Sequence, residues 1–375
     1  MSDAVRLYAG TQDGVHVWRR QGGGFEAVSS SFSGAIIEAL AGCTRSPERV
    51  FAGVAHDGLY RTIDGGKQWT KVLEGDVRSV AVDPASDDVL YAGMEPVWLY
   101  RSEDGGDSWE ALTSVMAFAL QNGVRFFQTF VHPVEAHPDA VRYKWWFPRR
   151  PHVAHITNIF IHPDNSNILF LSVEHGSILR SHDRGRTWED VTGGIEYKDI
   201  HILRNLPHSF ETYFVSTARG FFTSNDPARG WVRAENGFTR DYFHDFVILP
   251  PSGAEKNSTF VVATADQSPG FWNRPENSRA AIYRSFDDAR SWHRATAGLP
   301  DILAAMVWAL APHPNNPDIL FAGLGNVSRG YALPLPHYMG SGGPGQILQS
   351  RDRGVSWEDL GLALPPDRVL WAAAD

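Results

Sequence analysis

The sequence of 375 residues predicts an all-β fold, a seven-bladed β-propeller of four-stranded antiparallel blades. One observation is internal repetition: the stretch 60–69 recurs along the chain in the frame Ser/Thr-x-Asp-x-x-x-x-Trp. A second is that two further strand-like runs precede each copy, which gives four strands per repeat. A third is composition, since 35 Gly and 23 Pro are typical of many short strands joined by turns. Repeats of this length stack to bury a shared core.

The repeated frame predicts a tight turn between two strands. The aspartate carboxylate can accept backbone N–H bonds, and a following glycine can adopt positive φ. The Trp after the turn would anchor the hairpin against a neighbouring unit. We call these segments Asp-turns and interpret them as scaffold. The six Asp-turns are 62–69, 102–109, 181–188, 224–231, 285–292 and 350–357.

The Asp-turns resemble the Asp-box, or BNR repeat, of sialidase-like β-propellers, sortilin-type receptors and photosystem II assembly factors. That resemblance implies a structural role for the turn aspartates, which here are Asp64, Asp104, Asp183, Asp226, Asp287 and Asp352. Two turns depart from the glycine pattern, at 227–230 and 288–289, and are expected to be degenerate. Sialidases also have an Arg-Ile-Pro motif, an arginine triad and six blades, none of which this sequence indicates.

The third repeat shows the four strands most clearly. Its inner strand is 77–82, its second strand 89–93 and its third 98–102, and the fourth starts at Trp109. The second strand recurs at 50–53, 168–171, 212–215, 260–263 and 319–323.

The two ends of the chain together predict the seventh blade. Residues 7–10, 15–18 and 25–28 match the second, third and fourth strands, but no inner strand precedes them. Residues 368–373 follow the last Asp-turn, where an inner strand should come. We therefore expect the C-terminal strand to complete the N-terminal blade, which removes free sheet edges.

The repeats span the chain, so we expect a single domain over residues 1–375. Three segments are longer than the repeat requires: 113–151, 267–281 and 326–345. Strand direction places all three on one face of the predicted propeller. Long loops often contain functional residues, so this face is the expected working surface.

The same face receives the amino ends of the inner strands, where polar side chains occur in consecutive blades. The candidate catalytic residues are His155, His201, His244, Asp199, Asp245, Glu38 and Arg78. Strand alternation puts Asp199 and His201 on one side but His244 and Asp245 on opposite sides. His155, His201 and His244 could bind a divalent metal ion, or a His–Asp pair could serve as a general base without metal. An inert, water-filled polar channel is the alternative.

The insertions are rich in aromatic and basic residues. They could close a small-molecule pocket over the channel, or segment 113–151 could contact a protein partner. The candidate ligand-binding residues are Trp146, Trp272, Arg274, Arg329, Tyr331, His337 and Trp308. His175 and Glu174 lie in a turn on the same face, where turn chemistry explains them equally well.

Composition and charge narrow the class of protein. The formal net charge of −9 argues against a nonspecific nucleic-acid-binding surface. The sequence indicates neither a membrane span nor an apolar leader, so we expect a cytoplasmic protein without membrane contact. The lone Cys43 cannot form an intramolecular disulfide and is expected to be a buried, inert thiol.

Three functions follow as hypotheses. The first is an enzyme, a hydrolase or lyase acting on a small organic or sugar-like molecule at the channel mouth, with a divalent metal ion as its suggested cofactor. The second is a non-catalytic binding or assembly protein that recognises a partner through its aromatic insertions. The third is a glycosidase that uses two carboxylates from among Glu38, Asp199 and Asp245.

Overall fold

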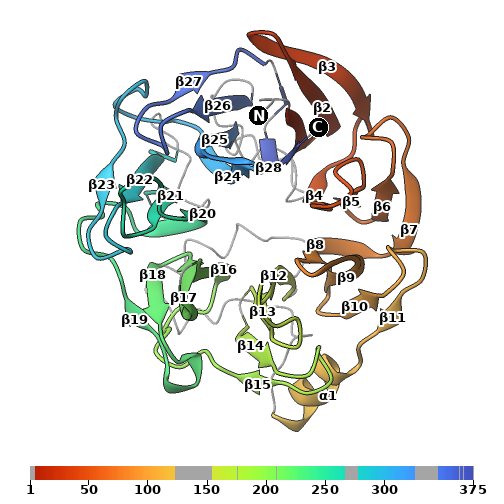
Figure 1. Cartoon of the computed structure of the whole chain (residues 1–375). Coiled ribbons are helices and arrows are strands. Elements are labelled where there is room, and N and C mark those ends of the chain that lie inside the picture. Colours follow the sequence, from red (N-terminus) through yellow and green to blue (C-terminus); the bar gives the residue numbers. More distant parts are fainter. Residues whose placement is uncertain are drawn as a thin grey trace, which may run out of the picture.

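Seven four-stranded antiparallel sheets surround a common axis in the computed structural model (Figure 1). The structure describes residues 5–122, 154–174, 176–207, 209–266, 278–325, 345–362, 364–365 and 367–374. The seven-bladed β-propeller predicted from the repeats is confirmed.

Each blade runs from an inner strand at the axis to a fourth strand at the rim. Blade one consists of β28 (Asp367–Ala374), β1 (Val5–Thr11), β2 (Gly14–Gln21) and β3 (Gly24–Ser31). Blade two contains β4 (Ile37–Gly42), β5 (Val50–Val54), β6 (Gly58–Thr62) and β7 (Thr70–Glu74). Blade three contains β8 (Asp76–Asp83), β9 (Ser86–Glu95), β10 (Leu99–Ser102) and β11 (Glu110–Ala111). Blade four contains β12 (Ile156–Ile161), β13 (Leu169–Val173), β14 (Ile178–Ser181) and β15 (Glu189–Asp190).

The remaining three blades follow the same order. Blade five contains β16 (Ile200–Leu206), β17 (Ser209–Thr217), β18 (Gly220–Ser224) and β19 (Val232–Arg233). Blade six contains β20 (Tyr242–Leu249), β21 (Thr259–Ala265), β22 (Ala281–Ser285) and β23 (His293–Arg294). Blade seven contains β24 (Met306–His313), β25 (Asn316–Gly325), β26 (Gln346–Ser350) and β27 (Glu358–Asp359).

The first blade is closed by the two ends of the chain, as predicted. Strand β28 pairs antiparallel with β1, from Val5 opposite Ala374 to Gly10 opposite Val369. The inner strand of blade one therefore comes from the C-terminal end of the chain, and the two ends lie close together (Figure 1). This pairing removes the free edge that the ring would otherwise leave.

The core lies between blades rather than within one. The second strands β5, β13 and β21 are buried at every position, because both of their faces pack against neighbouring sheets. Tyr91 and Leu99 of blade three, for example, share a cluster with Ile156 and Leu171 of blade four. Each blade thus needs its neighbours to bury its apolar residues.

One helix was not predicted from the sequence. Helix α1 (Ser114–Gln121) follows the last strand of blade three and buries Val115 and Ala119. The hydroxyl of Ser114 accepts a hydrogen bond from Trp188 Nε1 at 3.0 Å and donates to the carbonyl of Gly185. The helix therefore fixes the start of segment 113–151 against the Asp-turn of blade four. Among the described residues, no helix has the length and apolar character that crossing a membrane requires.

Five Asp-turns share one hydrogen-bond pattern. The Ser or Thr hydroxyl donates to the aspartate Oδ1 at 2.7–2.8 Å, at residues 62, 102, 181, 285 and 350. The same Oδ1 accepts the amide four residues after it at 2.8–3.0 Å. Each turn is therefore held by its own carboxylate, as expected for a scaffold element.

The turn of blade six keeps this pattern, so the expectation that it is degenerate is wrong. Asp288 and Ala289 adopt φ of 55° and 66°, and the amide of Ala289 donates to Ser285 Oγ at 3.0 Å. The turn persists although positive φ costs a non-glycine residue roughly 1–2 kcal/mol.

The turn of blade five is different, as predicted. Pro227–Arg229 forms a short 3-10 helix, η1, and Ser224 Oγ donates to the Gly230 carbonyl at 2.7 Å instead of to Asp226. Asp226 accepts only the Ala228 amide within the turn, at 3.2 Å, and pairs with Arg229 at 3.2 Å.

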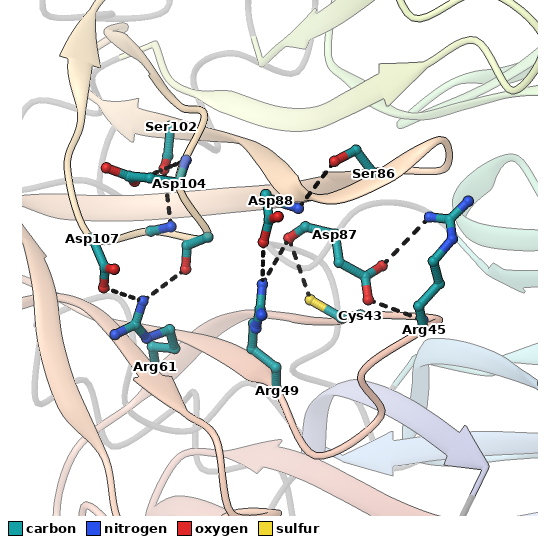
Figure 2. Close-up of polar contacts among 12 residues, drawn as sticks. Cys43, Arg45, Arg49, Arg61, Ser86, Asp87, Asp88, Ser102, Asp104 and Asp107 are labelled. Atoms are coloured by element: carbon teal, nitrogen blue, oxygen red, sulfur yellow. Dashed lines mark hydrogen bonds and ion pairs between the residues drawn. The ribbon is translucent and has the colours of Figure 1, made fainter.

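The boundary between blades two and three shows how Asp-turns join neighbours (Figure 2). Arg61 of blade two donates to the Gly105 carbonyl at 2.8 Å and to Asp107 at 2.7 Å in the Asp-turn of blade three. Arg49 reaches Asp88 at 2.9 Å. Cys43 lies beside these contacts; it is buried, and burial raises the pKa of its thiol to about 12, which confirms the expected buried position.

The Asp-turns generate a stability prediction with a control inside the chain. Burial acts to raise the pKa of Asp183, but hydrogen bonds from Thr187, Ser181 and the Arg186 amide lower it to about 2. We expect Asp183→Ala to cost roughly 1–3 kcal/mol at pH 7, and Asp226→Ala less than about 0.5 kcal/mol. Urea unfolding measures both.

The pH dependence of this effect has a defined sign. Because the pKa of Asp183 is lowered in the folded state, its stabilisation is present above the unfolded pKa of about 4 and is lost as pH falls toward 2. The difference between wild type and Asp183→Ala should therefore shrink between pH 5 and pH 2. Equal costs for Asp183→Ala and Asp226→Ala would contradict the scaffold assignment.

Candidate functional site

Every inner strand contains a β-bulge at the same level of the propeller. In each pairing of an inner strand with its neighbour the register shifts by an extra residue near the amino end of the inner strand. A bulge re-aims a side chain and interrupts the ladder. The bulge residues of blades two to seven, followed by that of blade one, are Glu38, Arg78, Thr157, His201, His244 with Asp245, Trp308 and Arg368.

Side chains at this level connect one blade to the next. Thr157 Oγ1 donates to the Ile200 carbonyl at 2.8 Å. The Nδ1 atom of His201 lies 2.6 Å from the Phe243 carbonyl, and that of His244 lies 2.9 Å from the Trp308 carbonyl. A carbonyl oxygen only accepts, so Nδ1 holds the proton in both rings. Thr157, His201 and His244 thus join inner strands that share no backbone ladder.

A cluster of charged residues surrounds Arg78. Its Nη1 donates to Glu38 at 3.0 Å, and its Nη2 contacts Glu95 at 2.6 Å and Asp76 at 3.3 Å. The exposed fractions of these four side chains lie between 8 and 19%. One guanidinium therefore contacts three carboxylates from two blades in a largely desolvated setting, where charge interactions are less screened than in water.

His155 lies between two glutamates. Its Nε2 is 2.9 Å from Glu174 Oε2, and its Nδ1 is 3.6 Å from Glu95 Oε2, the oxygen that Arg78 also contacts. Glu174 forms an isolated backbone bridge with Asp199 of the next blade. The arrangement Arg78, Glu95, His155, Glu174 extends the charged cluster from blade three into blade four.

His201 continues the cluster into blade five. Its Nε2 faces Asp199 Oδ1 at 3.3 Å, and its Nδ1 donates to the Phe243 carbonyl. Burial acts to lower the pKa of His201, but Asp199, the Phe243 carbonyl and Glu174 together raise it above the ordinary value. This confirms that Asp199 and His201 share one side of the strand. We call Glu38, Asp76, Arg78, Glu95, His155, Glu174, Asp199 and His201 the axial cluster.

Aromatic rings border the axial cluster in blades six and seven. The His201 ring lies 5.2 Å from the rings of His244 and Tyr242. Trp308 contacts His244 edge to face at 4.8 Å and donates from Nε1 to the Gly325 carbonyl at 2.9 Å. One half of this level is thus ionic and the other half aromatic.

Asp245 has a different environment from the axial cluster. It is buried, and it accepts the Phe246 and Leu310 amides at 2.8 Å each and contacts Arg204 at 3.2 Å. Burial raises the pKa of Asp245, although Arg204 and the two amides oppose that shift. These contacts join blade six to its neighbours on both sides.

Each of the three predicted metal ligands has contacts in the structure. The rings of His201 and His244 lie 5.2 Å apart, Nε2 of His201 faces Asp199, and Nε2 of His155 faces Glu174. His201 uses both ring nitrogens in contacts to oxygen atoms, whereas a metal ligand needs a free lone pair. In the described part of the chain no group of three or more His, Cys, Asp or Glu residues could hold a metal ion. A divalent metal ion at these histidines stays a prediction.

Several predicted ligand-binding residues fall outside the described ranges, and their roles stay predictions. They are Trp146, Trp272, Arg274, Arg329, Tyr331 and His337. Of that predicted group, Trp308 lies beside His244.

Sequence reasoning missed Glu95 and Asp76. The sequence did contain a signal for Glu95. Glu95 stands at the end of the second strand of blade three, and Glu174 stands at the matching position of blade four. Blades two and five have alanines at that position, Ala55 and Ala218. Two glutamates at one position of neighbouring repeats indicate a shared site. Asp76 faces Glu95 across the blade, which only strand register reveals.

Comparisons with solved structures support the fold. A GH74 enzyme from Niastella koreensis aligns with TM-score 0.60 and 15% identity over 94% of this chain and 46% of its own. The GH74 xyloglucanase from Xanthomonas campestris gives 0.59 and 17% over 92% and 46%. A structure of YCF48 bound to D1 peptide gives 0.51 and 16% over 87% and 80%.

These identities show a shared propeller fold and no more. The chain spans less than half the length of the two GH74 structures. No family model matches the sequence, and no curated protein matches it at a significant level.

His201 gives a pH-dependent prediction. Because its pKa is raised in the folded state, its stabilisation is fully present below the unfolded pKa of about 6.5 and is lost as pH rises through the folded value. We expect the free energy of unfolding of wild type to fall between pH 6 and pH 9, and His201→Gln to show a smaller fall.

His16 provides the matched control. Burial lowers the pKa of His16, so its contribution to stability changes with pH in the opposite sense, and His16→Gln should not reduce the fall seen in wild type. Urea unfolding at both pH values tests this. Parallel curves for His201→Gln and wild type would contradict the raised pKa of His201.

Proposed function

We propose that this chain is a hydrolase that cleaves a small sugar-like molecule at the axial cluster, with Glu95, His155 and Glu174 as its acid and base groups. The observation that supports this is the imidazole of His155 between two glutamates from neighbouring blades. The ring of Trp308, which is only partly buried, borders the cluster through His244 and is of the aromatic kind that small-ligand sites present.

The groups have distinct roles in the proposed reaction. Glu95 is positioned by Arg78 at 2.6 Å and takes a proton from water, whose oxygen bonds to the anomeric carbon. The His155–Glu174 pair, 2.9 Å apart, gives a proton to the leaving oxygen as the glycosidic bond breaks. Glu38 and Asp76 fix Arg78 and so act as positioning residues.

The structural neighbours are compatible with this proposal. Two of them have GH74 names, one a xyloglucanase, and so show that glycoside hydrolysis occurs on propellers of similar fold. We also propose that the Asp-turns are Asp-box repeats, because five of them share one hydrogen-bond pattern. A divalent metal is not part of the proposed mechanism.

A second candidate is a binding protein without catalysis. The observation that favours it is the pairing within the axial cluster, where Arg78 already contacts three carboxylates. One neighbour, YCF48, was solved with a bound peptide. A propeller of this fold can thus present a recognition surface rather than a reaction centre.

The experiment is a kinetic comparison on a panel of 4-nitrophenyl glycosides. We expect wild type to release nitrophenol with a bell-shaped pH profile, and Glu174→Gln to lower kcat/KM by roughly 10²–10⁴-fold. Glu110→Gln, an exposed carboxylate on β11, is the control and should match wild type. Melting curves check that each variant is folded.

Two outcomes would overturn the hydrolase proposal. One is equal turnover by Glu174→Gln and wild type, which would place the reaction elsewhere. The other is calorimetric binding of xyloglucan oligosaccharides by wild type without release of nitrophenol from any glycoside, which would support the binding protein instead.

A further inference from the structure

A cleft of about 760 Å³ opens between blades four and five, at the end of the strands opposite to the axial cluster. Its walls are the turn between β12 and β13, the turn between β16 and β17, and the altered Asp-turn of blade five. The length of strand β12 places the cleft on the order of 20 Å from His155. The cleft is therefore independent of the proposed hydrolase site.

This boundary lacks the arginine contacts that join blades two and three. Between blades two and three, Arg49 and Arg61 span the same position and bond to the next blade (Figure 2). In blade four, strand register places Ile168 at the position that Arg49 occupies in blade two. The side chain of Ile168 is shorter than that of arginine and carries no charge. At the position of Arg61, Arg180 donates to Glu189 of its own blade at 2.7 Å.

The turn of blade five, which would accept such an arginine, is also changed. In blade seven, as in blade three, a turn carbonyl accepts an arginine from the preceding blade, with Arg284 Nε 2.9 Å from the Arg353 carbonyl. Blade five has η1 in place of this turn, and its Asp226 is paired with Arg229. Neither side of this boundary supplies the arginine-to-turn contact that occurs between blades two and three and between blades six and seven.

The floor of the cleft is aromatic and contains an unused polar group. Tyr213 is 7% exposed and packs against Phe170 at 4.9 Å. Within the described part of the chain, its hydroxyl has no hydrogen-bond partner, although it lines the cleft. Burial raises the pKa of Tyr213, Arg180 opposes this and Glu211 adds to it, so the hydroxyl lies near both charges.

The rim is acidic. Asp164, Glu211 and Asp226 line it, and the guanidinium of Arg180 is already paired with Glu189. Asp164 and Glu211 are exposed, and the structure shows no ion pair for either among its described residues. Aromatic rings beneath carboxylates attract a cationic side chain through both charge and cation–π contact.

We propose that this cleft binds an extended basic segment of a partner protein. A Lys or Arg side chain of that segment lies over Phe210 and Tyr213, between Asp164 and Glu211. The Tyr213 hydroxyl donates to a backbone carbonyl of the segment, which satisfies a group that is otherwise unpaired. Charge complementarity and the open passage between two blades favour a peptide over a compact ligand.

The test is fluorescence anisotropy with two labelled peptides, Gly-Ser-Lys-Arg-Ser-Gly and Gly-Ser-Glu-Glu-Ser-Gly. We expect the basic peptide to bind at least about tenfold more tightly than the acidic one, since tenfold corresponds to a single favourable charge contact. Asp164→Asn with Glu211→Gln should weaken binding by about tenfold, and Tyr213→Phe by about threefold with the basic preference retained.

The control is the double variant Glu26→Gln with Glu110→Gln. It makes the same change in net charge at exposed carboxylates on β3 and β11, away from the cleft. It should bind like wild type, whereas nonspecific attraction to an acidic protein would weaken equally in both double variants. That equal loss, or tighter binding of the acidic peptide through Arg180, would overturn the proposal.

Discussion

The β-bulge near the amino end of each inner strand is the constraint on which this structure depends. It adds one residue to the strand, and among the added residues are Glu38, His201 and Trp308. Hydrogen bonds from Thr157, His201 and His244 then reach the carbonyl groups of the next inner strand. His201 belongs both to these contacts and to the axial cluster, whereas Glu95, His155 and Glu174 join that cluster from positions outside the bulges.

The two ends of the propeller differ in how they use the repeat. At the Asp-turn end five turns share one hydrogen-bond pattern, and Arg61 and Arg284 each bond to the turn of the next blade. At the other end the bulge residues differ from blade to blade, which places acids, a guanidinium and imidazoles beside one another. Between blades four and five, where Arg180 bonds within its own blade and η1 replaces the regular turn, a cleft opens. Variation within a regular frame therefore produces both candidate sites.

Much of the fold was predictable because the Asp-turn fixes strand order and direction in six places. That frame placed Asp199, His201 and Arg78 at one level, and the structure confirms this placement. It did not reveal Glu95 or Asp76, because their contacts depend on register across a strand pair and between blades. It also misjudged blade six, where Ala289 accepts positive φ and preserves the turn. Helix α1 has no counterpart in the repeat, so periodicity could not indicate it.

The central claim is that the axial cluster, and not the repeated Asp-turn, is where this protein acts on a ligand. The most direct measurement is a crystal structure of the protein soaked with a xyloglucan oligosaccharide. The account predicts sugar density within hydrogen-bond distance of Glu95 and Glu174, with Arg78 still bound to Glu38. Sugar density at the Asp-turns, or an axial cluster that stays closed by its own contacts at saturating sugar, would contradict it.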